Sequence, residues 1–485
     1  MKLNLRLILS FIGLLLVLNG IFMFLCIPYS LYYHDGDLHA LLISGAINIG
    51  VGLLLYFSLY KKYSEEVKRR DGYLIVTLGW VTISLFGTLP YLLSGSIPSF
   101  TNAFFEAISG YTTTGASILS DIEAMPKGIL LWRSMTQWIG GMGIIVLTVA
   151  ILPLLGVGGM QLFVSEAPGI SPDKLTPRIN ETARRLWSIY VGLTVLETII
   201  LKLGGMDLYD ALNHSLTTMA TGGFSTKQDS LAHFDSAFIQ YVVIIFMFIA
   251  GINFTLTFHA IGGKWKKLTS NEEFKAYYIV ILFFTFLTTI ALLQADSKNF
   301  EESFREALFQ IVSIISTTGF ATTDYTSWET YMVFIILIIM FIGGSAGSTA
   351  GGVKIIRHLI LFKNSILELR RLIHPSAVIA VRINKRAIGD KITYNVLAFI
   401  IIYVVIFAVG SALLAFTGVD FTTSIGAVAT SLANIGPGLG EVGPAGHFGN
   451  IPDASKWILT FLMLLGRLEL FTVLILFTTY FWSTS

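Results

Sequence analysis

The sequence contains little charge and a single cysteine. Only 13% of its 485 residues are Asp, Glu, Lys or Arg, and 54% are hydrophobic, whereas soluble proteins carry about 25% charged residues. The mean hydropathy is +0.74. These values exclude a soluble protein and indicate that most of the chain is surrounded by lipid. The lone Cys26 lies in an apolar run, which excludes an intrachain disulfide and a cysteine-based metal site.

Signatures of enzymes and of nucleic-acid binding are also missing. The eight histidines form no i, i+4 pair within one apolar segment, which argues against haem or zinc. Neither a nucleophile elbow nor an HExxH motif is present. The net charge is +2, and no basic patch interleaved with aromatic residues suggests nucleic acid. We therefore expect no catalytic residue, no organic cofactor and no nucleic-acid partner.

Long apolar segments begin near the first residue. A membrane helix needs about 20 apolar residues, and residues 7–31 and 38–60 meet this length. The first segment resembles a signal peptide in position. It is longer than a signal-peptide core, however, and no small-residue cleavage site follows it. We predict two leading transmembrane helices.

A short polar motif with glycine recurs along the rest of the chain. Residues 111–117 read Tyr-Thr-Thr-Thr-Gly-Ala-Ser, and related stretches occupy 219–224, 316–321 and 433–438. The glycines that we compare are Gly115, Gly222, Gly319 and Gly436, each roughly a quarter of the chain from the next. Irregular backbone is tolerated at membrane depth only where it is buried in protein or lines a watery cavity. Four such stretches therefore predict the loops of an ion filter.

Each motif lies between two long apolar segments, so the chain reads as four units. The predicted outer helices are 73–93, 183–203, 276–294 and 392–416, the pore segments are 99–116, 207–223, 302–320 and 420–437, and the inner helices are 129–156, 237–261, 330–362 and 456–481. We predict an all-α polytopic membrane protein with four pseudo-repeats of helix, pore loop and helix around one central pore, plus the two leading helices. The boundaries are 1–70 for the leading pair and 71–160, 161–265, 266–375 and 376–485 for the repeats.

Loop charges predict the orientation. Basic residues gather in 61–70, 174–185, 264–275 and 354–391, and the last of these linkers holds nine Lys or Arg. The pore-loop sides carry acidic residues instead, such as Asp121, Glu301 and Glu441. By the positive-inside rule, both termini and all linkers are cytoplasmic. We predict ten full spans and four re-entrant loops in a bacterial inner membrane.

The filter interpretation assigns cation coordination to backbone carbonyl groups. The predicted ligands, for transported K⁺, are Thr113, Thr114, Gly115, Ala220, Thr221, Gly222, Thr317, Thr318, Gly319, Asn434, Ile435 and Gly436. Because backbone carbonyl groups coordinate the cation in this interpretation, side-chain identity matters less, and Ala220 and Ile435 are tolerated as ligands. Helix capping remains the alternative for any single threonine.

The third inner segment contains five glycines in ten residues. Residues 343–352 read Gly-Gly-Ser-Ala-Gly-Ser-Thr-Ala-Gly-Gly, and each glycine costs about 1 kcal/mol in a helix. We predict a break at this point and a loop beneath the filter that obstructs the path. The candidate gate residues are Gly343, Gly344, Ser345, Gly347, Gly351 and Gly352. A small-residue helix-packing face is the alternative.

Arg467 lies midway along the last apolar segment and completes the predicted gate. A charge at that depth is expensive and functional by default. The alternative is a structural ion pair, for which Glu469, two residues on, is not an obvious partner. Gln137 and Asn253 are expected to form hydrogen bonds between helices, not to bind ions.

Together these motifs resemble the TrkH/KtrB superfamily of potassium-uptake proteins over essentially the whole chain. The most specific are Thr-Thr-Thr-Gly-Ala at 112–116, Thr-Gly-Gly-Phe-Ser at 221–225, Thr-Thr-Gly-Phe at 317–320, Asn-Ile-Gly-Pro-Gly-Leu-Gly at 434–440, Gly-Gly-Met-Gly-Ile-Ile at 140–145 and Gly-Arg-Leu-Glu at 466–469. The two leading helices are similar to the TrkH branch.

The resemblance implies a pore within one chain, a homodimer, and a cytosolic nucleotide-binding regulator resembling TrkA. It also implies a gate formed by the glycine-rich loop and Arg467. Four filter glycines favour K⁺ over Na⁺ within such a family. We expect K⁺ uptake through a channel-like pore. A symporter coupled to H⁺ or Na⁺ is the alternative, and a membrane-embedded enzyme or redox subunit is an alternative of another class.

Overall fold

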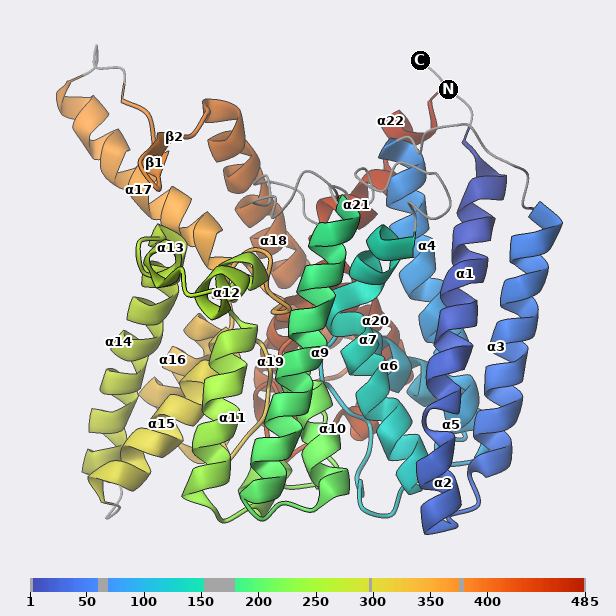
Figure 1. The fold of residues 1–485 in the computed structure, drawn as a ribbon. Coiled ribbons are helices and arrows are strands. Elements are labelled where there is room, and N and C mark those ends of the chain that lie inside the picture. Colours follow the sequence, from blue (N-terminus) through green and yellow to red (C-terminus); the bar gives the residue numbers. More distant parts are fainter. Residues whose placement is uncertain (1–2, 60–68, 152–178, 296–298, 375–378, 484–485) are drawn as a thin grey trace.

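The computed structural model describes residues 3–59, 69–151, 179–295, 299–374 and 379–483. Helices that run roughly along one direction form a single bundle (Figure 1). Within the described ranges the only sheet is a two-stranded hairpin of β1 (Arg382–Ile383) and β2 (Arg386–Ala387). The predicted all-α fold is confirmed.

The leading segment forms α1 (Leu5–Phe24), α2 (Ile27–Tyr33) and α3 (Leu38–Leu59). The Asn4 side chain caps α1 by accepting from the Leu7 backbone N–H at 3.2 Å. Glycines let α1 and α3 approach closely, since a Cβ added at Gly13 would lie 2.6 Å from the Gly52 carbonyl oxygen. The two predicted leading helices are confirmed.

The outer and pore helices of the four repeats follow the predicted pattern. The outer helices are α4 (Arg69–Gly87) with α5 (Leu89–Leu93), α9 (Ile179–Leu203), α14 (Glu272–Ala295) and α18 (Asp390–Phe416), and the pore helices are α6 (Phe100–Tyr111), α10 (Leu208–Met219), α15 (Phe300–Ile315) and α19 (Phe421–Ala433). The side chains of Asp207, Asn299 and Asp420 cap the last three pore helices. These caps satisfy backbone N–H groups at helix starts that are exposed, as Leu208, Phe300 and Phe421 are.

The inner helices differ from the prediction, because breaks interrupt all four. They are α7 (Lys127–Ile151), α11 (Ala237–Ala250) with α12 (Phe254–Ile261), α16 (Thr330–Ile339) with α17 (Ile355–Ile373), and α20 (Asp453–Arg467) with α21 (Phe471–Leu474). The break in 330–362 was predicted, whereas 129–156, 237–261 and 456–481 were wrongly predicted as continuous helices. Residues 152–156 of the first lie outside the described ranges.

The unpredicted breaks are visible in the backbone geometry, and the one after α11 coincides with hydrogen bonds from a distant segment. Gly143 adopts φ 72° within α7. The axes of α11 and α12 differ by 112°, and that of α20 differs by 109° from the helical segment Phe471–Phe477. At the first bend the Ala250 and Gly251 carbonyls accept hydrogen bonds from residues 349 and 345, so they cannot continue the helix. At the second bend Glu469 and Leu470 adopt positive φ.

By length and composition, six helices in the described ranges can cross a membrane, or eight if each bent pair is one span. The other two of the ten predicted spans are the first and third inner segments, α7 and α16 with α17. Bulky apolar side chains face outward on the outer helices, for instance Phe286 at 65% and Ile401 at 62% exposure. This is the surface expected of a multi-pass membrane protein.

Both described ends of the chain meet the start of α4. The Asn4 backbone N–H donates to Asp71 at 3.1 Å, and Arg70 donates to the Ser483 carbonyl at 2.9 Å. The final α22 (Thr479–Trp482) therefore lies beside the beginning of α1 (Figure 1). Both described ends of the chain therefore lie at the same end of the bundle as the start of α4. Most basic residues predicted at 61–70 and 174–185 lie outside the described ranges.

The third linker forms a structured arm on this same face. The helix α17 projects from the bundle, and the hairpin pairs Arg382 with Ala387 and Ile383 with Arg386 (Figure 1). Asn384 and Lys385 both adopt positive φ at the turn. Lys363 of α17 donates to the Arg382 carbonyl at 2.9 Å. The hairpin thus ties α17 to the linker that follows it.

The remaining described elements are short. They are α13 (Trp265–Thr269) and the 3₁₀ turns Ser230–His233, Tyr325–Ser327, Gly440–Val442, Phe448–Asn450 and Ile475–Phe477. Two large apolar clusters form the core. One surrounds the pore helices of repeats one and four, and the other those of repeats two and three.

Candidate functional site

The four pore helices end in the same hydrogen-bonded turn. In the first, the Thr113 N–H donates to the Gly110 carbonyl at 2.9 Å, and the Thr114 N–H donates to the Ser109 carbonyl at 2.9 Å. The corresponding pairs recur at Thr221 and Gly222, at Thr317 and Thr318, and at Asn434 and Ile435. This is the Schellman pattern of helix termination. It turns the chain sharply at the same point of every repeat.

A residue other than glycine occupies the left-handed position of each turn. Thr113, Thr221, Thr317 and Asn434 have φ of 53°, 54°, 57° and 55°. A left-handed residue with a side chain costs about 1–2 kcal/mol. The same strain at four equivalent places marks a functional site. Sequence reasoning placed all four residues among the filter ligands, but not in this conformation.

The turns correct the predicted alignment of the second repeat. Two residues after the left-handed residue, Gly115, Gly223, Gly319 and Gly436 adopt φ of 82°, 75°, 81° and 104°. The glycine equivalent to Gly115 is therefore Gly223, not Gly222. The predicted triplet Ala220, Thr221 and Gly222 is shifted by one residue, and Thr221, Gly222 and Gly223 are equivalent to Thr113, Thr114 and Gly115. Two adjacent glycines made the motif ambiguous.

These glycines and the carbonyls that precede them form a closed ring, which we call the filter ring. A Cβ added at Gly115 would lie 2.1 Å from the Gly222 oxygen, and one at Gly223 would lie 2.0 Å from the Thr318 oxygen. A Cβ added at Gly319 would lie 1.7 Å from the Ile435 oxygen, and one at Gly436 would lie 2.9 Å from the Thr114 oxygen. Each repeat thus touches the next, and the fourth touches the first. Only glycine fits such close backbone contact.

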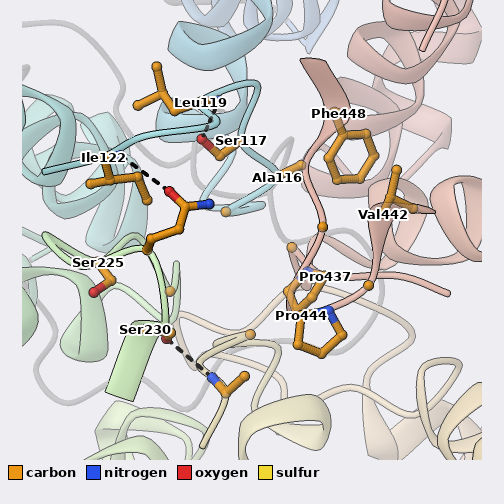
Figure 2. Close-up of a pocket in the computed structure, with 18 of the residues that line it drawn as sticks. Ala116, Ser117, Leu119, Ile122, Ser225, Ser230, Pro437, Val442, Pro444 and Phe448 are labelled. Atoms are coloured by element: carbon orange, nitrogen blue, oxygen red, sulfur yellow. Dashed lines mark hydrogen bonds between the residues drawn. The ribbon is translucent and has the colours of Figure 1, made fainter. Parts of the chain in front are cut away.

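A hollow opens on one side of the filter ring, and all four glycines of the ring line it. The space in the hollow, counted together with the open solvent that joins it, is about 560 Å³. Figure 2 shows Ala116, Ser225 and Pro437, from three different repeats, around this space. Because the pore helices converge on the ring, the negative ends of their dipoles face its centre and favour a cation there.

A buried ion pair supports the wall of this hollow. Arg133 of α7 and Glu106 of α6 approach to 2.6 Å, with side chains 2% and 0% exposed. Glu106 also accepts from the Ser117 hydroxyl at 3.0 Å and the Ile118 N–H at 2.9 Å, and Arg133 donates to the Ser225 carbonyl at 3.0 Å. The pair therefore holds the strands that leave the filter ring in repeats one and two.

The equivalent positions of repeats two and three also carry polar side chains, which support their strands in different ways. His214 stands seven residues before Thr221, as Glu106 stands before Thr113, and its Nε2 lies 2.9 Å from the Ser225 hydroxyl. Gln310 in the third repeat donates to the Thr323 carbonyl at 3.2 Å. Sequence reasoning missed these residues. A charged or polar residue within an apolar pore segment was the available signal.

Gln137 clamps the second strand of the filter ring. Its amide nitrogen donates to the Gly222 carbonyl at 2.6 Å, and its amide oxygen accepts from the Phe224 N–H at 3.0 Å. Asn253 caps α12 and donates to the Ala346 carbonyl at 2.6 Å. Both were predicted to form hydrogen bonds between helices, and both do.

The glycine-rich loop, residues 343–352, lies directly against the other side of the filter ring. The Gly351 N–H donates to the Thr317 hydroxyl at 2.6 Å. The Gly343 N–H donates to the Val353 carbonyl at 2.9 Å, so the loop closes on itself at its base. The Thr349 hydroxyl reaches the Met219 carbonyl at 3.1 Å and the Ala250 carbonyl at 3.2 Å. The loop thus spans from its own repeat to the second.

Arg467 connects this loop to the first repeat. One guanidinium nitrogen donates to the Thr349 carbonyl at 2.9 Å, and the other donates to the carbonyls of Gly140 and, at 2.8 Å, Gly141. Arg467 therefore bonds to a carbonyl of the loop with which the sequence analysis paired it. Arg467 is the last residue of α20 and not midway along a helix, so its charge also faces the negative helix end.

Two further cations stand beside the loop. Lys354 is 8% exposed and donates to the Ala350 carbonyl. Arg357 of α17 pairs with Glu469, the residue that the sequence analysis did not favour as a partner of Arg467. The Ala346 N–H donates to the Glu273 carboxylate at 2.6 Å. Groups from repeats two, three and four therefore contact the glycine-rich loop, and Arg467 links it to the first repeat.

Four re-entrant turns that meet in a ring inside an apolar helical bundle define a multi-pass membrane transport protein of the pore-loop type. The family model TrkH, described as a cation transport protein, matches residues 38–483. The chain belongs to the TrkH family.

Individual relatives agree with this assignment. The chain is 42% identical over 484 residues to the Trk system potassium uptake protein TrkH of Halomonas elongata, with 99% of each chain covered. It is 41% identical over 481 residues to the protein of that name from Escherichia coli, covering 98% and 99%. The crystal structure of the potassium transporter TrkH from Vibrio parahaemolyticus matches with a TM-score of 0.89 at 40% identity, covering 99% and 100%. The predicted family, its fold and its classification as a transporter, not an enzyme, are confirmed.

Proposed function

We propose that this protein takes up K⁺ across the bacterial inner membrane through a pore that selects K⁺ and Rb⁺ over Na⁺. The observation that carries the proposal is the filter ring, in which each strand packs its glycine against the carbonyl before the glycine of the next strand. Rings of backbone carbonyls replace the water shell of K⁺ in filters of this kind. The names of the relatives, potassium uptake proteins, support the choice of cation.

The coordinating groups in this proposal are the carbonyls around the ring. With the corrected register, the equivalent residues are Thr113, Thr114 and Gly115, then Thr221, Gly222 and Gly223, then Thr317, Thr318 and Gly319, and finally Asn434, Ile435 and Gly436. Ala220, which we predicted as a ligand, then precedes the left-handed turn, as Thr112 does in the first repeat.

We also propose that the glycine-rich loop and Arg467 close the path. The loop contacts the filter ring through Gly351 and Thr317, and Arg467 bonds to the loop at Thr349. A fixed guanidinium repels a cation, and a low-dielectric surround strengthens the repulsion. Opening then requires that these contacts break together.

In this proposal a soluble regulator breaks these contacts and opens the path. The arm formed by α17 and the hairpin begins immediately after the glycine-rich loop, and Arg370 and Arg371 lie in its last helical turn. In this proposal a cytosolic nucleotide-binding protein resembling TrkA docks on this basic face, which is cytoplasmic, and the transporter is a homodimer. The name Trk system, shared by the relatives, is consistent with several components.

The test is ion flux into liposomes that contain only this purified protein. We expect Rb⁺ uptake that K⁺ blocks and Na⁺ does not, driven by the membrane potential at about 2.3 kcal/mol per charge per 100 mV. Equal competition by Na⁺ and K⁺ would contradict the filter assignment. Uptake that stops when a pH or Na⁺ gradient is removed would instead establish the symporter alternative.

A further inference from the structure

The leading helices contain buried polar side chains, although helices at the edge of a membrane bundle can be built from apolar side chains alone. The helices α1 and α3 stand at one edge of the bundle, outside the four repeats (Figure 1). Even so, Asn19 of α1 is 3% exposed and Asn48 of α3 is 0% exposed. A buried amide is costly unless its hydrogen bonds are made. The partners of these two side chains therefore reveal what the leading helices hold in place.

The two asparagines form a relay that ends at the first pore helix. The Asn48 amide nitrogen donates to the Ser44 carbonyl at 2.9 Å. The Asn48 amide oxygen accepts from the Asn19 amide nitrogen at 3.0 Å. The Asn19 amide oxygen in turn accepts from the Tyr111 hydroxyl at 2.5 Å. One continuous chain of hydrogen bonds thus joins α3, α1 and α6.

Tyr111 is the last residue of α6 and stands two residues before the left-handed Thr113. Its side chain is fully buried and packs on Gly87, where an added Cβ would lie 2.5 Å from the ring. Its carbonyl packs on Gly140, where an added Cβ would lie 2.0 Å away. The ring and the main chain of Tyr111 are therefore both fixed, and any movement of the residue is passed directly to the filter strand.

No other repeat has this connection. The residues equivalent to Tyr111, two before each left-handed residue, are Met219, Ile315 and Leu432, and none carries a hydroxyl. The hydroxyl occurs only in the repeat next to the leading helices. The filter ring is thus anchored at one of its four strands by helices that do not belong to the fourfold arrangement.

We infer that α1 and α3 set the position of the first strand of the filter ring through Asn48, Asn19 and Tyr111, and that these three are positioning residues for cation selectivity. The inference rests on the proposed function, since it concerns the selectivity of the same ring. The carbonyls of the four strands must stand at one level to act together. A directional hydrogen bond at the end of α6 keeps the Thr114 carbonyl at that level.

The experiment compares Tyr111→Phe, Asn19→Leu and the double variant in liposomes, with the ratio of Rb⁺ to Na⁺ uptake as the readout. We expect each single variant to lower the ratio about fivefold, and the double variant to lower it no further, because both changes break one relay. Asn48→Leu, one step further from the filter, should lower it less. Thermal melting of each variant in detergent confirms that the protein is folded.

Tyr403→Phe is the matched control. Tyr403 of α18 is 3% exposed, and its hydroxyl has no hydrogen-bond partner among the described residues, so its removal should leave the ratio unchanged. Tyr111→Phe keeps the ring and gives the mildest change if Asn19→Leu fails to fold. An unchanged ratio in folded Tyr111→Phe protein, or an equal loss in Tyr403→Phe, would overturn the inference. A wild-type protein without Rb⁺ preference would refute the proposed function instead.

Discussion

Two glycine-rich regions meet at the centre of this protein, and different kinds of contact hold them. Each strand of the filter ring begins with the same local turn, in which two successive N–H groups bond to carbonyls three and five residues earlier. The glycine-rich loop depends on side chains distant in sequence, such as Asn253, Glu273 and Arg467. A ring with local contacts in every strand keeps its shape. A loop held by a few separate polar contacts is released when they are broken.

The largest expected effect comes from filling the ring. We predict that Gly319→Ala lowers selective Rb⁺ flux about a hundredfold, because its methyl group would collide with the Ile435 carbonyl and alanine resists positive φ. Gly436→Ala should lose less Rb⁺ flux. Its Cβ would lie 2.9 Å from the Thr114 oxygen, whereas the Cβ at position 319 would lie 1.7 Å from the Ile435 oxygen. Flux into liposomes measures both.

Gly95→Ala separates backbone strain from close contact in this series. Gly95 has φ 71° but nothing within 4 Å of an added Cβ. We expect its flux to stay near the wild-type value. Equal losses in Gly319→Ala and Gly436→Ala would contradict the geometry of the ring.

The second effect concerns the ion pair behind the ring. Removing one partner of a buried pair costs about 3–5 kcal/mol. We therefore predict that Glu106→Ala lowers the free energy of unfolding by about this amount, seen as a lower melting temperature in detergent. Glu301→Ala is the control, because Glu301 is 53% exposed and pairs with Arg305 on the surface, where such a pair is worth about 0.2–1 kcal/mol. Similar melting of the two variants would show that the buried pair is not stabilising.

The third effect tests whether the loop is releasable. Arg467→Ala removes hydrogen bonds to three carbonyls, each worth about 1.5–3 kcal/mol when charged. We predict basal Rb⁺ flux about tenfold above wild type, with selectivity intact. Arg467→Lys keeps the charge without the forked geometry, so its basal flux should lie between that of the wild type and that of Arg467→Ala. Lower flux in Arg467→Ala at equal folded protein would show that Arg467 supports the path instead of closing it.

The smallest expected effect is at Asn253, which both caps α12 and holds the loop. We predict that Asn253→Ala raises basal flux about threefold, since loss of a single cap or contact costs about 1 kcal/mol. Asn253→Ser keeps a capping hydroxyl but cannot reach the Ala346 carbonyl in the same way. The loop contact is responsible if Ser is as leaky as Ala. A wild-type flux in Asn253→Ser would assign the effect to the cap alone.

Sequence reasoning succeeded where a signal was local and repeated. Apolar length located the leading and outer helices, the recurring glycine motif located the pore helices, and the five glycines of 343–352 located the break in the third inner segment. It failed at the breaks near Gly251 and Glu469, because the contacts at these breaks are with partners about a hundred residues away. It also failed to choose between Gly222 and Gly223, since only backbone conformation distinguishes two adjacent glycines.

The sequence by itself determined the membrane class, the four repeats and the family, because hydropathy and repeated motifs are local properties of the sequence. Only the tertiary structure decided which glycine of each repeat faces its neighbour's carbonyl, and that Arg467, Asn253 and Thr349 meet around one loop. It alone revealed that Asn19 of a leading helix reaches Tyr111 at the filter. Contacts between residues far apart in sequence depend on how the helices pack, and no local pattern records that packing.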